Sequence, residues 1–208
     1  MNGSAKNNIL KKIRLALAHP TPIPFPKSEG TTSVFQPLQQ DIVVEFAEQF
    51  TQLQGKFSFC TDEKELNEQF TQLCYLHQWT KIFCAEEKWL KLLPSTILTD
   101  DIINCEASVT SCEALVARTG SIVLSTKNGG RINSVYAPVH ICIAYASQLT
   151  YDIKDALQLL KQKYQQQLPS MISFATGPSR TADIEKTLVV GVHGPKEVYC
   201  FLVDAPIP

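Results

Sequence analysis

The sequence predicts an α/β protein with a mostly parallel sheet flanked by helices. Short apolar segments rich in β-branched and aromatic residues recur along the chain, and amphipathic helical patterns with capping residues separate them. Strands that alternate with helices are typical of parallel sheets, because a parallel connection must cross from one end of the sheet to the other.

Helix starts are indicated by acidic capping residues ahead of apolar residues at helical spacing. Asp41 and Asp152 each precede such a pattern, and Asp62 with Glu65 resembles a capping box. We therefore expect long helices after these three aspartates. The expected helices run to 53 after Asp41, to 73 after Asp62 and to 164 after Asp152, with shorter ones at 86–92 and 112–117.

Strands are expected where short apolar runs lie between turn signals, and residues 139–146 give the clearest case. Asn128-Gly129 is a tight-turn signal, which predicts an antiparallel hairpin after Ser125. The expected strands are 56–60, 81–84, 106–110, 121–125, 139–146, 170–175, 188–190 and 198–203.

The first forty residues differ from the rest. Residues 4–18 predict an amphipathic helix with Ile9, Ile13 and Leu17 along one stripe. This helix would pack on its own domain, or contact a partner or a membrane surface. Five prolines in residues 19–40 predict an extended arm. We thus expect a helix and proline-rich arm at 1–40 and a single α/β domain at 41–208.

Composition excludes several classes of protein. The 208 residues carry a net charge of −1, which argues against a dedicated nucleic-acid binder. No apolar run reaches the ~18 residues of a membrane span, and basic residues interrupt any secretory pattern at the start, so we expect a cytoplasmic protein. The seven cysteines form no C-x-x-C pair, which predicts reduced, buried thiols rather than a zinc or iron–sulfur site.

Three of the four arginines lie beside small or glycine-rich segments: Arg118 in A-R-T-G-S, Arg131 in N-G-G-R and Arg180 in G-P-S-R-T. A guanidinium fork matches carboxylate or phosphate. We expect these loops to converge on a pocket for a small anion; the alternative is that three surface arginines happen to lie in loops.

Polar residues around these arginines complete the candidate site. Asp183 and Glu185 would hold a metal or share acid–base work, or Asp183 would cap a turn beside a solvated Glu185. His193 would act as acid, base or ligand, or would cap a strand. The predicted ligand-binding residues are Arg118, Thr119, Gly120, Arg131, Gly177, Ser179, Arg180, Thr181, Asp183 and His193.

No catalytic residue is assigned from the sequence. Ser179 has no visible base partner. Cys112, next to Glu113 at the start of an expected helix, would be a nucleophile only if that helix stabilised its thiolate. His140 alternates with apolar residues, which predicts a core histidine.

Three blocks of sequence resemble the LUD-domain family: T-S-C-E-A-L-V-A-R-T-G-S-I-V-L at 110–124, P-V-H-I at 138–141, and G-P-S-R-T-A-D-I-E with G-V-H-G-P within 177–195. The resemblance implies the fold of the ribose-5-phosphate isomerase, glucosamine-6-phosphate deaminase and CoA-transferase group. It also implies work beside two iron–sulfur partner proteins that oxidise L-lactate to pyruvate, with the clusters in the partners and no cofactor in this chain.

Three functions stay open at this point. The first is an accessory subunit of a lactate-oxidising system with a small-anion pocket. The second, by fold analogy alone, is an independent transferase-like or isomerase-like enzyme acting on sugar phosphates or CoA thioesters. The third is a non-catalytic interaction module that uses the helix at 4–18 and the arm.

Overall fold

The structure is a computed structural model that describes residues 5–18, 37–127, 130, 132–165, 167–181 and 189–205. The chain divides into two compact units, Met1–Pro37 and Leu38–Pro208. Most of the expected proline arm lies outside the described residues. Among the described residues, no helix has the length and apolar character needed to cross a bilayer.

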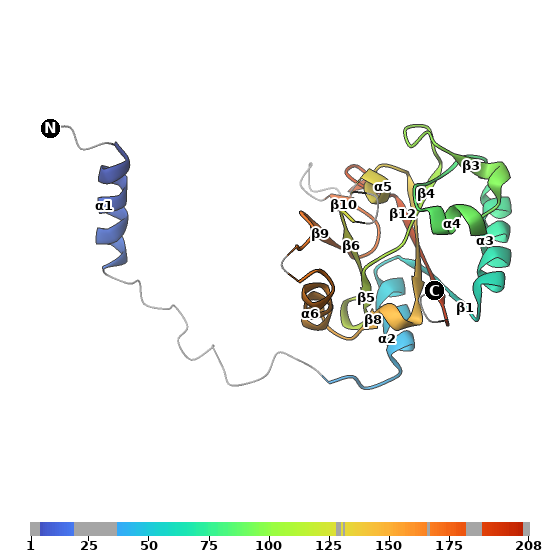
Figure 1. Ribbon diagram of the computed structural model, residues 1–208, viewed down its shortest axis with the longest axis horizontal. Coiled ribbons are helices and arrows are strands. Elements are labelled where there is room, and N and C mark those ends of the chain that lie inside the picture. The colour runs from blue at the N-terminus through green and yellow to red at the C-terminus, as the bar shows by residue number, and fades with distance from the viewer. Residues whose placement is uncertain are drawn as a thin grey trace. The chain divides into compact units, whose positions relative to one another are not determined.

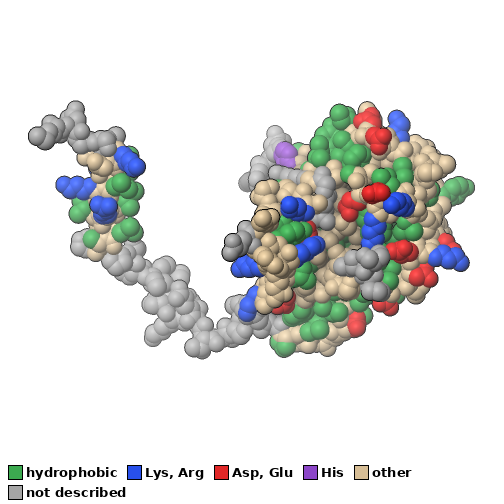
Figure 2. Space-filling model, in the orientation of Figure 1, with side chains coloured by type: hydrophobic (Ala, Val, Ile, Leu, Met, Phe, Trp, Pro, Cys, Tyr) green, Lys and Arg blue, Asp and Glu red, His purple; other side chains and the backbone are tan. Residues whose placement is uncertain are grey.

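The first unit contains helix α1 (Ala5–Leu17), close to the expected helix at 4–18. Its apolar stripe is exposed, including Ile9, Ile13 and Leu17. Basic and apolar side chains share its surface (Figure 2).

The second unit is built on a six-stranded sheet whose strands all run parallel (Figure 1). β12 and β7 occupy central positions, with β1 and β3 at the two edges. In spatial order the strands are β1 (Lys56–Cys60), β12 (Glu197–Val203), β7 (Val139–Tyr145), β4 (Ala107–Thr110), β2 (Ile82–Cys84) and β3 (Leu98–Thr99).

A second, four-stranded sheet is mixed. β6 pairs antiparallel with both β5 and β9, whereas β5 and β8 are parallel. A two-stranded ribbon of β10 (Arg180–Thr181) and β11 (Val189–Val190) lies outside both sheets. The strands of the second sheet, in spatial order, are β8 (Leu149–Thr150), β5 (Ala114–Val116), β6 (Ser121–Ser125) and β9 (Ile172–Ala175).

Helices and sheets form successive layers (Figure 1). α3 and α4 cover one face of the six-stranded sheet, the second sheet and α2 cover the other, and α6 packs on the outer face of the second sheet. The helices of this unit are α2 (Ile42–Gln52), α3 (Glu63–His77), α4 (Glu87–Leu92), α5 (Ile132–Val135) and α6 (Ile153–Tyr164), with short 3-10 turns η1 (Ser95–Ile97), η2 (Ala117–Thr119) and η3 (Ala146–Gln148).

The central strands are buried on both faces. Along β7, Ile141 and Ile143 join the core under α3 and α4, while Cys142 and Ala144 join the core between the two sheets. Successive side chains of a strand point to opposite faces. A strand buried on both sides therefore has an apolar run without polar alternation, which explains the strength of the signal at 139–146.

Two sequence predictions are wrong in the same region. The expected helix at 112–117 is instead strand β5, because its residues pair with β6 and β8 and are buried on both faces. The antiparallel hairpin lies between β5 and β6 through η2, and not after Ser125, where the chain continues to α5 and then β7. Asn128 and Gly129 lie outside the described residues.

All seven cysteines are free, and their burial agrees with the prediction of mostly buried thiols. Cys112 has no helix start beside it. A hydrogen bond with Cys142 and burial raise the pKa of Cys112 well above its usual value. The sequence hypothesis of a stabilised Cys112 thiolate is therefore wrong.

Gly120 → Ala is expected to destabilise the fold more than Gly130 → Ala. Both glycines have positive φ, but a Cβ at Gly120 would lie 2.5 Å from the backbone nitrogen of Phe50, whereas nothing lies within 4 Å at Gly130. Left-handed strain costs roughly 1–2 kcal/mol and overpacking adds about 1–3 kcal/mol. Urea unfolding of both variants measures the difference; equal losses would contradict the packing of Gly120 against α2.

Candidate functional site

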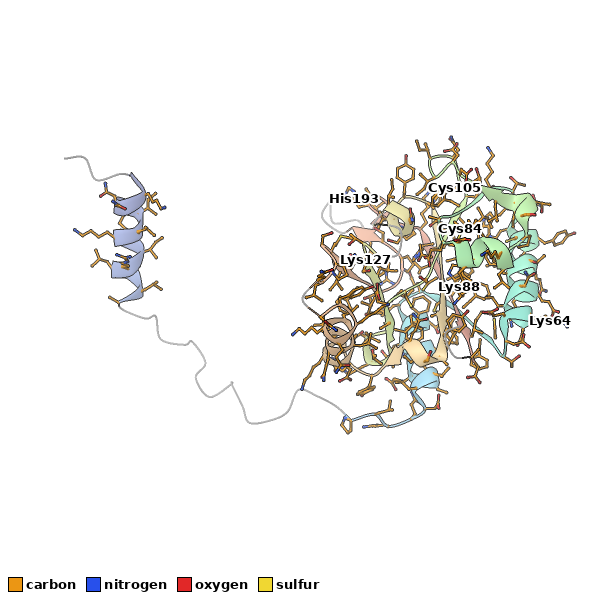
Figure 3. The ribbon with its side chains drawn as sticks, viewed as in Figure 1. Lys64, Cys84, Lys88, Cys105, Lys127 and His193 are labelled. Atoms are coloured by element: carbon orange, nitrogen blue, oxygen red, sulfur yellow. The ribbon has the colours of Figure 1, made fainter. Side chains whose placement is uncertain are left out.

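A cavity of about 480 Å³ lies between the second sheet and the amino-terminal ends of β7 and β12. Two loops from the block at 177–195 form part of its wall, through Gly177 to Ser179 and through His193 to Pro195. Figure 3 labels His193 in this region. The volume of this cavity lies within the roughly 300–1,000 Å³ typical of ligand pockets.

Backbone hydrogen bonds hold the two loops together. The amide of Ser179 donates to the carbonyl of Pro195 over 2.9 Å, and the amide of Gly191 donates to the carbonyl of Ser179 over 2.9 Å. A Cβ on Gly194 would lie 3.0 Å from that of Ser179, so the loops pass close to each other. The structure thus brings three predicted residues, Gly177, Ser179 and His193, to one cavity.

Arg180 anchors this wall and does not line the cavity. Its Nη2 donates a 2.7 Å hydrogen bond to the carbonyl of Leu53, just after α2. A Cβ on Gly177, where φ is +80°, would lie 2.4 Å from the same carbonyl oxygen. The end of α2 therefore fixes the loop at two points, and only glycine allows the closer one.

The segment Thr119-Gly120-Ser121 contacts the cavity wall through Ser121. Ser121 Oγ lies 2.8 Å from both Thr119 Oγ1 and Thr176 Oγ1. Thr176 lines the cavity. Thr119 therefore reaches the cavity wall through Ser121, Gly120 packs against α2, and neither residue lines the cavity.

Arg118 is engaged elsewhere. Its Nε lies 2.5 Å from Asp152 Oδ2, and this hydrogen bond lowers the pKa of Asp152. Arg118 and Arg180 thus each bond an acceptor of the fold, and neither guanidinium lines this cavity. A role for either in binding a ligand stays a prediction.

The side chains of three further predicted residues, Arg131, Thr181 and Asp183, are not described by the structure. Arg131 and Asp183, together with Glu185, lie outside the described residues. Thr181 belongs to β10, but its side chain is not among those described.

His140 is the polar residue deepest in the wall. It is 1% exposed, and its Nε2 lies 2.8 Å from Thr110 Oγ1. Burial lowers the pKa of His140 to about 4, so the ring is neutral at physiological pH. The prediction of a core histidine is confirmed, but its place beside a cavity was not foreseen because the sequence does not show which loops cover β7.

A small neighbouring cavity continues the site toward Thr110 and Ser125. The two cavities share Leu124 and Ser134 from the β6 and α5 side and Met171 and Ser173 from the β9 side. Hydroxyl groups from four separate stretches of chain, carried by Thr110, Ser125, Ser134 and Ser173, therefore line this part of the site.

Sequence reasoning missed a buried carboxylate that holds Ser125. Glu113 is 3% exposed, and its carboxylate accepts hydrogen bonds from Ser125 Oγ (2.5 Å), Lys163 Nζ (2.8 Å) and the hydroxyl of Tyr164 (2.7 Å). Burial acts to raise the pKa of Glu113, and these hydrogen bonds outweigh it and lower the pKa. No sequence spacing predicts this pairing, because α6 lies about fifty residues further along the chain.

Metal ligands do not gather in the part of the chain that the structure describes: there, no group of three or more His, Cys, Asp or Glu side chains could hold a metal ion.

The sequence model of the LUD domain family matches residues 76–203, more than half of the chain and all of the cavity wall. The chain belongs to the LUD domain family. The fold agrees with a solved structure of a DUF162 family protein from Deinococcus radiodurans, with a TM-score of 0.59 and 16% identity over 78% of this chain and 96% of that one. The predicted α/β class is confirmed.

Curated relatives named lactate utilization protein C are more similar in sequence. The chain is 39% identical over 99 residues to the protein from Bacillus licheniformis and 37% identical over 101 residues to that from Shouchella clausii. These matches cover 46% and 48% of this chain but only 41% and 44% of the relatives. The chain thus spans less than half the length of the curated relatives it matches.

The free energy of unfolding is expected to fall as the pH drops from about 6.5 to about 4, because the unfolded chain binds a proton on His140 that the folded chain refuses. The full difference corresponds to about 3 kcal/mol. The free energy of unfolding, measured with denaturant at several pH values in this range, should change less with pH in His140 → Gln than in the parent. The same dependence on pH in the parent and in His140 → Gln would contradict a neutral buried His140.

Proposed function

We propose that this chain takes part in lactate utilisation as a subunit that binds a small carboxylate in the cavity between the two sheets. The observation that carries the proposal is the meeting of the 177–179 and 193–195 loops at one cavity with His140 in its wall. Support for the pathway comes from the relatives named lactate utilization protein C.

The wall suits a small acid in chemical terms. Ser134, Ser173 and Ser179 present hydroxyl donors, and His193 adds a ring nitrogen at an exposed position. Oxygens of a carboxylate accept such hydrogen bonds. Leu124 and Val198 give the same cavity an apolar side that fits the carbon skeleton of an organic acid.

In this proposal the electron transfer belongs to iron–sulfur partner proteins. The buried thiols of this chain support that division, because Cys142 and Cys200 lie within the inter-sheet core, where they pack as apolar side chains. The role of this chain is then to bind the acid and to assemble with the partners.

The cavity is tested by thermal unfolding of the full chain with L-lactate, pyruvate, acetate and inorganic phosphate. A carboxylate present at ~100 times its Kd should add about 2.7 kcal/mol of stability. Ser179 → Ala and His193 → Ala should reduce the shift, whereas Ser58 → Ala, on the edge strand β1, should leave it unchanged. Absence of a shift with any carboxylate, or equal shifts in all variants, would refute the site.

The assembly is tested by affinity isolation of the tagged full chain from its host, grown on L-lactate or on glucose. Iron and additional proteins are expected with the chain from lactate-grown cells, and no iron with the chain purified alone. Recovery of the chain without iron from lactate-grown cells would contradict the proposed partners.

A further inference from the structure

Three polar residues lie on the inner face of the six-stranded sheet, toward the cavity. Ser108 and His140 are register partners on β4 and β7, and Thr110 lies two residues along β4 from Ser108. Their neighbours Val109 and Ile141 belong to the core on the opposite face. Because side chains alternate along a strand, all three polar side chains face the second sheet.

Two of these side chains have hydrogen-bonding capacity that the described fold leaves unused. Ser108 is 0% exposed, and its Oγ has no hydrogen-bond partner among the described residues. His140 bonds Thr110 through Nε2 while its ring lines the cavity, which leaves Nδ1 for the cavity. A polar atom without a partner costs free energy, so an occupant of the cavity that accepts a hydrogen bond from His140 recovers part of that cost.

The contact with Thr110 decides which ring nitrogen carries the proton. The hydroxyl proton of the buried Thr110 needs an acceptor, and Nε2 is the acceptor that its oxygen contacts. A neutral imidazole that accepts at Nε2 carries its proton on Nδ1. With this tautomer His140 presents an uncharged N–H donor to the cavity, while its register partner Ser108 lies beside it on β4 and lines neither cavity.

We propose that His140 Nδ1–H donates to the carbonyl oxygen of a 2-oxo acid, that Thr110 fixes the tautomer, and that the cavity thereby prefers a 2-oxo acid over the matching 2-hydroxy acid. The inference rests on the proposed function of the cavity as a carboxylate site. A carbonyl oxygen only accepts, whereas a hydroxyl brings another proton next to an N–H donor that needs an acceptor.

Thr110 is a positioning residue in this scheme. Replacing it by valine removes the hydroxyl and nearly keeps the side-chain shape, which frees the histidine to adopt either tautomer. Thr150 → Val is the matched control, because Thr150 lies on β8 and bonds the carbonyl of Leu115, and it lines neither of the two cavities.

The experiment measures binding of pyruvate and L-lactate to the full chain by calorimetry and the imidazole ¹⁵N shifts by NMR. We expect the parent to bind pyruvate at least threefold more tightly than L-lactate. Thr110 → Val should weaken pyruvate binding about tenfold, equivalent to roughly 1.4 kcal/mol, and shift the His140 signals from the Nδ1–H form toward a mixture. Thr150 → Val should match the parent in both readouts.

Ser108 → Ala provides a second variant that removes the unpartnered hydroxyl without adding bulk. It should fold at least as stably as the parent and should keep the preference for pyruvate, because Ser108 lines neither of the two cavities. Binding of neither acid by the parent would overturn the proposed function and this inference with it. Equal binding of both acids by the parent, or parent-like affinity and NMR shifts in Thr110 → Val, would overturn this inference alone.

Discussion

The burial of β7 and β12 on both faces is the constraint on which the rest of the second unit depends. Each of these strands supplies one set of side chains to the core under α3 and α4 and the other set to the core between the sheets. Burial of apolar surface is the main favourable term in folding. The two helices, the second sheet and α2 are therefore held in place by the same two strands, which also carry part of the cavity wall through His140 and Val198.

Because the inner face of the six-stranded sheet is buried, any polar group on it needs a hydrogen-bond partner. Thr110 supplies one partner to His140, and the ring borders the cavity that β9 and the loops at 177–179 and 193–195 also line. The loop at 177–179 is in turn held against the carbonyl of Leu53, through Gly177 and through Arg180. Core packing and site geometry are thus connected through α2, which touches both the inter-sheet core and the loop that closes the cavity.

The sequence predicted the elements whose signals are local. Asp152 caps α6 as expected, and 121–125 is a strand with the expected bounds. It failed at 112–117, where pairing with two strands outweighs the helical preference of alanine and leucine. The site shows the same difference between local and long-range signals. Three residues of the 177–195 block were predicted and do line the cavity. The partners of Arg118 and Arg180 were missed, because they come from other parts of the chain and such contacts leave no periodic signal.

The buried thiols have a practical consequence for studying motion. Cys142 and Cys200 are register partners on the two central strands, and both are fully shielded from solvent. A thiol reagent can modify them only when the sheets separate, so their rate of alkylation measures how often the inter-sheet core opens. The alkylation rate of these two thiols therefore reports how often the two sheets separate. Binding of a ligand between the sheets would lower that rate.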